Sequence, residues 1–378
     1  MRPAAPEALL QRLAEWEQSD AVRAVLLRSS SERAFCSGGD VKAIALDLKA
    51  DSASQTPYIA LSNEYRLLCA LQRWTASEGL DIPSVALMDG VTMGFGVGLA
   101  CNTRFRVITE RTLLAMPENA IGLFPDIGFA FLTRDRPTLG LYLALTGTRL
   151  GGKASPASDI LALGLATHFV PSAKLGELEA ALRGAPLAAA PAGDNDAVIR
   201  GILEQFSCAC PAPASIDALE GMLEACFRPD KMRSVQDITA ALKTRAGDGA
   251  AEAASAEQQA ARAALDGMAL ASPTSLALTL AHFRAVGEAK ATGQTLSQVT
   301  LSQVLSTEYR LATRMCLRPD FAEVPSPPPL PLPPGRLTDF AGSVGLSGPS
   351  VCLSVCRFVC LVVCVQSVEI RRELQVWV

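Results

Sequence analysis

The stretch "SVALMDGVTMGFGVGLACN" (84–102) decides the fold class of this 378-residue chain. Residues 84–90 form a short apolar run typical of a buried strand, and a Gly-rich turn then opens a helical segment. The same order occurs upstream, where a strand over 21–29 precedes the turn "CSGGD" and a helix over 41–50 that Asp40 can cap. Repeated strand–turn–helix units predict an α/β core.

The rest of the chain divides into two further regions by its pattern. Strands are predicted over 104–109 and 112–116, followed by a helix, turns and a short strand up to Val170. From about Lys174 the spacing becomes helical and continues to about Arg318, with a loop over 185–196. We therefore expect an α/β core over 1–173 and a helical C-terminal region over 174–323.

The last segment, residues 324–378, has a different composition. It begins with "PSPPPLPLPP" (325–334), which cannot continue a helix. Cysteines then recur every four residues, at Cys352, Cys356, Cys360 and Cys364. A stripe of thiols could bind metal, but no His or acid lies nearby to complete a ligand set, and a four-base DNA repeat would also give this period. We expect this tail to be disordered or a gene-model artefact, outside the fold.

Composition and charge exclude several classes of protein. The chain is 49% hydrophobic and has a formal net charge of −4, which gives no electrostatic reason to expect a nucleic-acid partner. No run of 18 apolar residues predicts a membrane span, and the N-terminus has an amphipathic helical pattern, not that of a secretory signal. The cysteines of the first 320 residues indicate reduced thiols. The two histidines, His168 and His282, are too few for a histidine-based metal site and are expected to be structural.

Two Gly-rich turns and two acids are the features that could carry chemistry. The glycines of "GFGVG" (94–98) have the wrong spacing for a dinucleotide loop, but together with "FCSGGD" (35–40) their backbone N–H groups could hold one oxyanion. Glu118 and Asp126 lie in the otherwise apolar "LAMPENAIGLFPDIGF" (114–129). Each alone could be an ordinary acid of a helix start or a turn. As a pair, one could activate water and the other could assist proton transfer or orient a substrate.

These segments resemble the crotonase superfamily and, within it, the 3-hydroxyisobutyryl-CoA hydrolases. The resemblance covers about residues 1–323 and is carried by "RAFCSGGDVKAI", "MDGVTMGFGVGLA", "RFRVITERTLLAMPENAIGLFPDIG" and "LSQVLSTEYRLATRMCLRPDF". It implies an α/β fold made of a spiral of β-β-α units, with a helical C-terminal region. It also implies hydrolysis of a short 3-hydroxyacyl-CoA thioester in valine catabolism, without a cofactor, since CoA is part of the substrate.

The resemblance assigns roles to individual residues. Glu118 would be the main catalytic carboxylate with Asp126 as its partner, and the N–H groups of Gly39 and Phe95 would form the oxyanion hole. The substrate-binding residues would be Glu64, which would bind the acyl hydroxyl, together with Gly94 and Gly96. No metal, nucleic acid or membrane is implied, whereas a homo-oligomer and a mitochondrial location are compatible with the family.

The sequence departs from the family at one loop position and at both ends. The family has three glycines where this chain has Gly94-Phe95-Gly96. If that position needs a positive φ, Phe95 is strained by roughly 1–2 kcal/mol, and its ring could crowd the CoA channel. We expect the family's first strand and targeting peptide to be missing before Met1, and a further helix to be replaced by the Pro-rich tail.

Three functions therefore compete. The first is thioester hydrolysis. The second is enoyl-CoA hydration or isomerisation, disfavoured because hydratases usually have glycine at the Asp126 position and tend to carry a second acid at the Gly98 position. The third is a non-catalytic acyl-CoA-binding remnant, which Phe95 and the atypical ends favour. Release of free thiol from an acyl-CoA distinguishes the first from the third.

Overall fold

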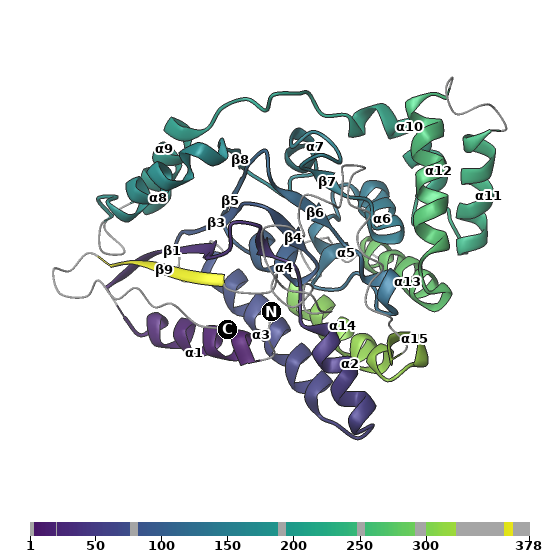
Figure 1. The fold of residues 1–378 in the computed structure, drawn as a ribbon, viewed down its shortest axis with the longest axis horizontal. Coiled ribbons are helices and arrows are strands. Elements are labelled where there is room, and N and C mark those ends of the chain that lie inside the picture. The colour runs from purple at the N-terminus through teal and green to yellow at the C-terminus, as the bar shows by residue number, and fades with distance from the viewer. Residues whose placement is uncertain are drawn as a thin grey trace, which may run out of the picture.

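The structure, a computed structural model, describes most of the chain in seven segments. These are residues 4–19, 21–75, 82–187, 194–247, 254–291, 300–322 and 359–365. Figure 1 shows two sheets at the centre, with helices around them and a cluster of helices at one side.

From β1 to β6, successive strands of the core alternate between two sheets. The first sheet has the order β8-β5-β3-β1-β9 and the second β2-β4-β6-β7. Neighbouring strands are parallel, except that β9 pairs antiparallel with β1 and β7 with β6. This alternation is the predicted spiral of β-β-α units. The strands are β1 (Val22–Ser29), β2 (Ala34–Cys36), β3 (Ser84–Met88), β4 (Val91–Met93), β5 (Phe105–Ile108), β6 (Leu113–Ala115), β7 (Leu150–Gly151), β8 (His168–Phe169) and β9 (Val359–Val365).

The strands form where apolar residues run without alternation. All five residues of β3 are buried, because a parallel sheet is covered on both faces. Strands at 21–29, 84–90, 104–109 and 112–116 were predicted and are confirmed. The three-residue β4 was missed, because its pattern was read as part of the following turn.

Six helices accompany the strands of the core. Asp40 caps the second of them by accepting a hydrogen bond from the N–H of Ala43 at 3.0 Å, as predicted. The long third helix, which carries Glu64 and Tyr65, was not predicted. The helices are α1 (Ala4–Glu17), α2 (Val41–Ala50), α3 (Thr56–Thr75), α4 (Phe95–Cys101), α5 (Phe129–Leu132) and α6 (Pro137–Thr146), with the 3-10 helix η1 (Glu118–Ile121) between α4 and α5.

After β8 the described residues up to Ala322 form helices. They are α8 (Leu175–Arg183), α9 (Asn195–Phe206), α10 (Glu220–Cys226), α11 (Val235–Ala246), α12 (Ala256–Ala269), α13 (Pro273–Ala291), α14 (Leu301–Cys316) and α15 (Pro319–Ala322), with the short η2 (Ser172–Lys174) and η3 (Ile216–Leu219); α7 (Ser158–Ala162) precedes β8. Helices α9 and α12 lie in the predicted helical region but were not delimited individually from the sequence. One hydrophobic core contains residues from Leu9 to Phe321, so the helical region packs onto the α/β core. In particular α14 packs against α3, and α13 against α6.

The expectation that residues 324–378 lie outside the fold is wrong for one segment. Residues Val359–Val365 form β9, whose backbone pairs with the full length of β1 (Figure 1). The run "VCLVVCV" is rich in β-branched residues, and without β9 the backbone of β1 would have no strand on that side. The other residues of the tail, including Cys352 and Cys356, lie outside the described residues.

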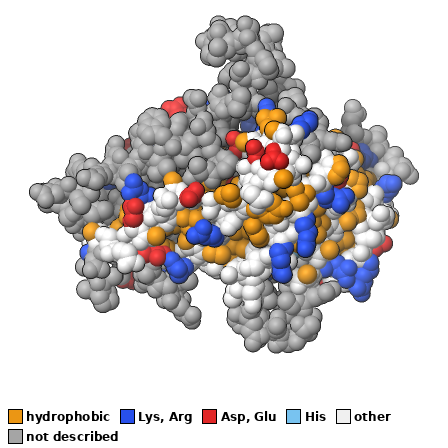
Figure 2. Space-filling view, turned by 90° about the horizontal axis from the view of Figure 1, so that it is seen from below, with side chains coloured by type: hydrophobic (Ala, Val, Ile, Leu, Met, Phe, Trp, Pro, Cys, Tyr) orange, Lys and Arg blue, Asp and Glu red, His pale blue; other side chains and the backbone are white. Residues whose placement is uncertain are grey.

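The surface carries both hydrophobic and charged side chains. Figure 2 shows the face that is lowest in Figure 1, where hydrophobic side chains form a band with several Lys and Arg beside it. Two exposed large hydrophobic residues, Leu46 of α2 and Ile59 of α3, are isolated in sequence. Within the described segments no helix is long and apolar enough to span a membrane, and the cysteines between Cys36 and Cys316 are free thiols.

Candidate active site

The two Gly-rich turns lie side by side, as the sequence suggested. A Cβ on Gly94 would be 3.8 Å from the Cα of Gly38, and one on Gly96 would overlap the carbonyl oxygen of Cys36. Only glycine at position 96 therefore permits this approach of α4 to β2. Among the described residues, the N–H groups of Gly39 and Phe95 have no hydrogen-bond acceptor. Two free N–H groups on adjacent loops are what an oxyanion hole requires.

Glu118 is the first residue of η1 and lies against the second of these turns. A Cβ on Gly94 would be 2.5 Å from Oε1 of Glu118, so the carboxyl group touches the turn that presents the Phe95 N–H. Glu118 is buried, and among the described residues its Oε2 has no hydrogen-bond partner. Burial, and secondarily the charge of Asp126, hold the pKa of Glu118 well above its usual range. A buried acid with an unused oxygen is poised to take a proton from a bound molecule.

Asp126 is buried in a turn with an unusual backbone. The next two residues, Ile127 and Gly128, have φ values of +53° and +75°, and a β-branched residue is rare in this region. The hydroxyl of Tyr65 donates a hydrogen bond to Oδ2 of Asp126. Burial and the nearby charge of Glu308 raise the pKa of Asp126 to about 7, against the lowering effect of the Tyr65 hydrogen bond. Strained turns of this kind often occur at functional sites.

Glu64 faces the first Gly-rich turn. A Cβ on Gly39 would be 2.7 Å from Oε1 of Glu64, so this carboxyl group lies directly beside the Gly39 backbone. Burial, with a further contribution from the charge of Asp126, raises the pKa of Glu64 to about 8. The structure thus brings together three buried carboxyl groups and the two turns, and all the residues predicted for the site are in this region.

The raised pKa of Glu64 predicts a pH-dependent stability. The folded state favours the neutral form of Glu64. The contribution of Glu64 to the free energy of unfolding is therefore fully present below its unfolded pKa of about 4.5 and is lost as the pH rises through about 8. Glu64→Gln removes this dependence. As the pH rises across this window, the wild type loses stability and the variant does not. We therefore expect the free energy of unfolding of the variant, relative to that of the wild type, to increase by up to about 1.4 kcal/mol per pH unit.

Urea unfolding of both proteins at pH 5, 6.5 and 8 measures this difference. Glu204→Gln, which changes an exposed acid of α9, is the matched control and should show no trend. A constant difference between Glu64→Gln and the wild type over these pH values would contradict a raised pKa for Glu64.

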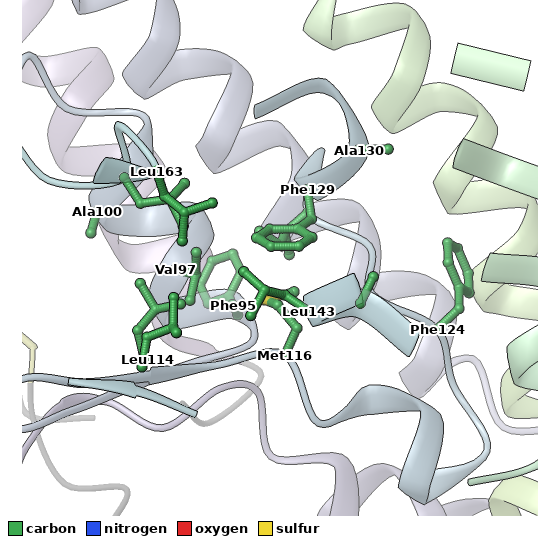
Figure 3. Close-up of a cluster of buried hydrophobic side chains, with 14 of the residues drawn as sticks. Phe95, Val97, Ala100, Leu114, Met116, Phe124, Phe129, Ala130, Leu143 and Leu163 are labelled. Atoms are coloured by element: carbon green, nitrogen blue, oxygen red, sulfur yellow. The ribbon is translucent and has the colours of Figure 1, made fainter. Parts of the chain in front are cut away.

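Phe95 does not have the strained geometry considered from the sequence. Among described residues other than glycine, Ile127 alone has a positive φ, and the left-handed position of this loop is Gly94, at +51°. Phe95 is the first residue of α4, and its ring is buried. Figure 3 shows the ring among Val97, Met116 and Leu143 in the hydrophobic core. The condition for backbone strain, a positive φ at Phe95, is therefore not met, whereas crowding of the CoA channel by the ring stays a prediction.

Three residues that support Asp126 were not predicted. Tyr65 follows Glu64 in "SNEYRLL", and Glu308 precedes Tyr309 in "STEYRLA", but an acid beside a tyrosine has no specific meaning in a sequence. His282 was expected to be structural, and its Nε2 lies 2.8 Å from Oε1 of Glu308. The one available signal was that Glu308, an acid, falls on the apolar face of α14, where buried residues recur at helical spacing.

A surface pocket of about 390 Å³ lies elsewhere in the molecule. Its lining comes from the start of α6, from η3 and α10, and from the segment Arg228–Asp230. Its two arginines, Arg136 and Arg228, are paired with acids of the same lining. None of the carboxyl groups described above lines it, so we do not assign it to the site.

A family model described as enoyl-CoA hydratase/isomerase matches residues 4–324. The chain belongs to this family. The match covers the spiral of strands, the two Gly-rich turns and the helical region.

Curated members of the enoyl-CoA hydratase/isomerase family that resemble this chain include the mitochondrial 3-hydroxyisobutyryl-CoA hydrolases of Gallus gallus and Danio rerio. They are 37% and 36% identical over 82% of this chain and 71% and 72% of their own lengths. The resemblance to these hydrolases that the motifs indicated is confirmed. The small ribosomal subunit protein mS47 of Neurospora crassa is 36% identical over 72% of this chain, which spans about half (52%) of that protein.

Solved structures of the enoyl-CoA hydratase/isomerase family share the fold. A carnitinyl-CoA dehydratase from Mycobacterium thermoresistibile is 31% identical and superposes with a TM-score of 0.67 over 85% of this chain and 81% of its own. An enoyl-CoA hydratase from Rhodobacter sphaeroides is 28% identical, with a TM-score of 0.66 over 85% and 80% of the two chains. These matches confirm the predicted crotonase fold.

Gly98 is the position at which the resemblance places a second acid in the hydratases. A Cβ at this position would be 3.0 Å from the Cβ of Ile127 and 3.2 Å from Cδ1 of Leu68. The side chain of Ile127, next to Asp126, thus occupies the space that a second acid would need. We expect Gly98→Glu to destabilise the protein by more than about 3 kcal/mol, because it buries a carboxylate without a partner, and to add no hydratase activity.

Denaturant unfolding and the absorbance of an enoyl-CoA double bond measure the two effects. Gly98→Ala is the control, since its methyl group requires only small shifts of Ile127 and Leu68. A stable Gly98→Glu protein that hydrates an enoyl-CoA would show that the loop around Ile127 can rearrange.

Proposed function

We propose that this protein hydrolyses the thioester of 3-hydroxyisobutyryl-CoA, or of a related short 3-hydroxyacyl-CoA, to the free acid and CoA. The observation that carries the proposal is the buried carboxyl group of Glu118 against the Gly94 turn, with Asp126 nearby; Oε2 of Glu118 has no hydrogen-bond partner among the described residues. The names of the curated relatives support it. On the same grounds we place the reaction in valine catabolism and in the mitochondrion.

The mechanism follows from the positions of the groups. The thioester oxygen binds to the N–H groups of Gly39 and Phe95, and Gly94 and Gly96 let the acyl-CoA approach the backbone. Ionised Glu118 takes a proton from a water molecule, whose oxygen attacks the carbonyl carbon. The oxyanion hole stabilises the resulting negative charge. The C–S bond then breaks, and the CoA thiolate takes the proton from Glu118.

The other two acids have supporting roles in this proposal. Asp126 raises the basicity of Glu118 through its charge and helps to orient the water molecule. Glu64, beside Gly39, binds the hydroxyl group of the acyl chain. The reaction needs no cofactor, because water and the thioester are the only reactants. A proton acceptor in a desolvated pocket is a stronger base than in water.

One assay tests the proposal against both alternatives. The protein is incubated with 3-hydroxyisobutyryl-CoA, and a thiol reagent measures released CoA; a parallel reaction with an enoyl-CoA follows loss of its double bond. Thiol release without hydration supports the hydrolase. Hydration without thiol release would favour the second function, and binding of acyl-CoA without either reaction would favour the non-catalytic remnant.

A further inference from the structure

Helix α14 supplies a buried carboxyl group to the turn that carries Asp126. Oε2 of Glu308 accepts a hydrogen bond from the N–H of Gly128 at 2.8 Å, and its Oε1 lies 2.8 Å from Nε2 of His282 on α13. Glu308 is completely buried, and the His282 side chain is 3% exposed. Both carboxylate oxygens thus have one partner each, on two different elements.

The turn that Glu308 holds cannot keep its shape by local preference. Ile127 and Gly128 are both in the left-handed region, which is unfavourable for the β-branched side chain of Ile127. The hydrogen bond to Gly128 fixes the second of these two residues from outside the turn. The side chain of Leu301, also on α14, occupies the space where a Cβ on Gly128 would lie. Helix α14 therefore determines where the turn, and with it Asp126, is placed.

The opposite side of Asp126 is fixed by α3. Tyr65 donates its hydroxyl hydrogen to Asp126, and the rings of Tyr65 and Tyr309 of α14 meet edge to face with centroids 6.4 Å apart. Tyr309 follows Glu308 directly in the sequence. Two adjacent residues of α14 thus act on Asp126, one through the turn backbone and the other through Tyr65.

We propose that Glu308 is a positioning residue of the hydrolase: it holds the Asp126–Gly128 turn in its strained conformation and sets the electrostatic environment of Asp126. The inference rests on the proposed function. Glu308 does not reach the substrate but acts through Asp126. The charged and titratable groups around Asp126 are Glu64 and Tyr65 from α3, Glu118 from η1, His282 from α13, and Glu308 and Cys316 from α14.

Two substitutions separate the two parts of this role. Glu308→Ala removes the acceptor for Gly128 and the partner of His282. We expect kcat to fall about 10²-fold with KM changed less than about threefold, because a displaced reacting group affects turnover more than binding. Glu308→Gln keeps an oxygen for Gly128 and an amide for His282 but removes the charge, so it should restore most of kcat.

The charge effect has its own readout in the pH profile. The negative charge of Glu308 opposes ionisation of Asp126, so its removal lowers the pKa of Asp126. The limb of the kcat/KM profile that reports Asp126 should therefore move to lower pH by at least about half a unit in Glu308→Gln. Arg310→Ala, an exposed change two residues further along α14, is the control and should leave the profile unchanged.

Hydrogen exchange of the Gly128 amide makes the test independent of turnover. Exchange should accelerate in Glu308→Ala and return towards the wild-type rate in Glu308→Gln. A kcat for Glu308→Ala within twofold of the wild type, or an unmoved pH profile for Glu308→Gln, would overturn the proposal. If Glu308→Ala does not fold, the profile of Glu308→Gln decides. If the wild type releases no thiol, the proposed function fails, and the exchange rates alone decide whether Glu308 holds the turn.

Discussion

Glu118→Gln is expected to lower kcat for thioester hydrolysis by about 10²–10⁴-fold, the usual cost of losing a general base. The amide has the shape of the carboxyl group but cannot accept the proton of the attacking water. The substituted side chain still fits against Gly94, because it has the same number of heavy atoms. Binding of the acyl-CoA should change little, since the proposed contacts of the thioester are with backbone N–H groups.

Single-turnover release of CoA measures the decrease in the rate of hydrolysis. Binding of a non-hydrolysable acyl-CoA analogue shows whether the variant keeps its affinity for the substrate. Glu204→Gln, in an exposed position of α9, should retain wild-type activity. A Glu118→Gln protein with nearly full turnover would remove Glu118 from the mechanism and leave Asp126 as the candidate base.

Phe95→Ala is expected to destabilise the protein by about 3–5 kcal/mol, the usual cost of removing a buried phenyl ring. The ring is 3% exposed and lies in the main core (Figure 3). Phe95→Gly should cost still more, because glycine also weakens the start of α4. This expectation reverses the view from the sequence alone, in which glycine at this position would relieve strain.

Denaturant unfolding measures the stability, and the activity of Phe95→Leu separates stability from chemistry. Leucine keeps part of the apolar volume, so a smaller loss is expected, and kcat should stay within about threefold because every variant retains the N–H of residue 95. Unchanged stability together with a raised kcat in Phe95→Gly would show that the ring obstructs the site.

Local patterns predicted the part of the fold that depends on short segments. The apolar run of β3 and the cap at Asp40 can be seen in the residues themselves. By contrast, α3 was missed because its polar residues, including Glu64, are buried by contacts with distant elements. The strand β9 was missed because its pairing with β1 joins segments more than 300 residues apart.

The candidate site also has some features that the local sequence shows and others that depend on distant contacts. Glu118 and Asp126 stand out because acids are rare in an apolar segment. The environment of Phe95 could not be deduced, because a backbone angle is a property of the folded loop: the left-handed residue is Gly94, one position earlier. Glu308 lies 180 residues after Gly128, and no local pattern indicates which backbone amide a distant carboxyl group will meet.

Glu308 lies on α14, which is synthesised well after the residues that it supports, and this order matters while the protein is being made. A ribosome adds about 5–20 residues per second, so roughly 7–26 seconds separate the completion of β8 at Phe169 from the arrival of α14 at Leu301. During this interval the nascent chain contains Glu118 and Asp126 but not the helix that holds the Gly128 turn and covers α3. Newly made protein therefore acquires a fully supported site only after α14 has been synthesised, following a period in which an apolar face is open to chaperones.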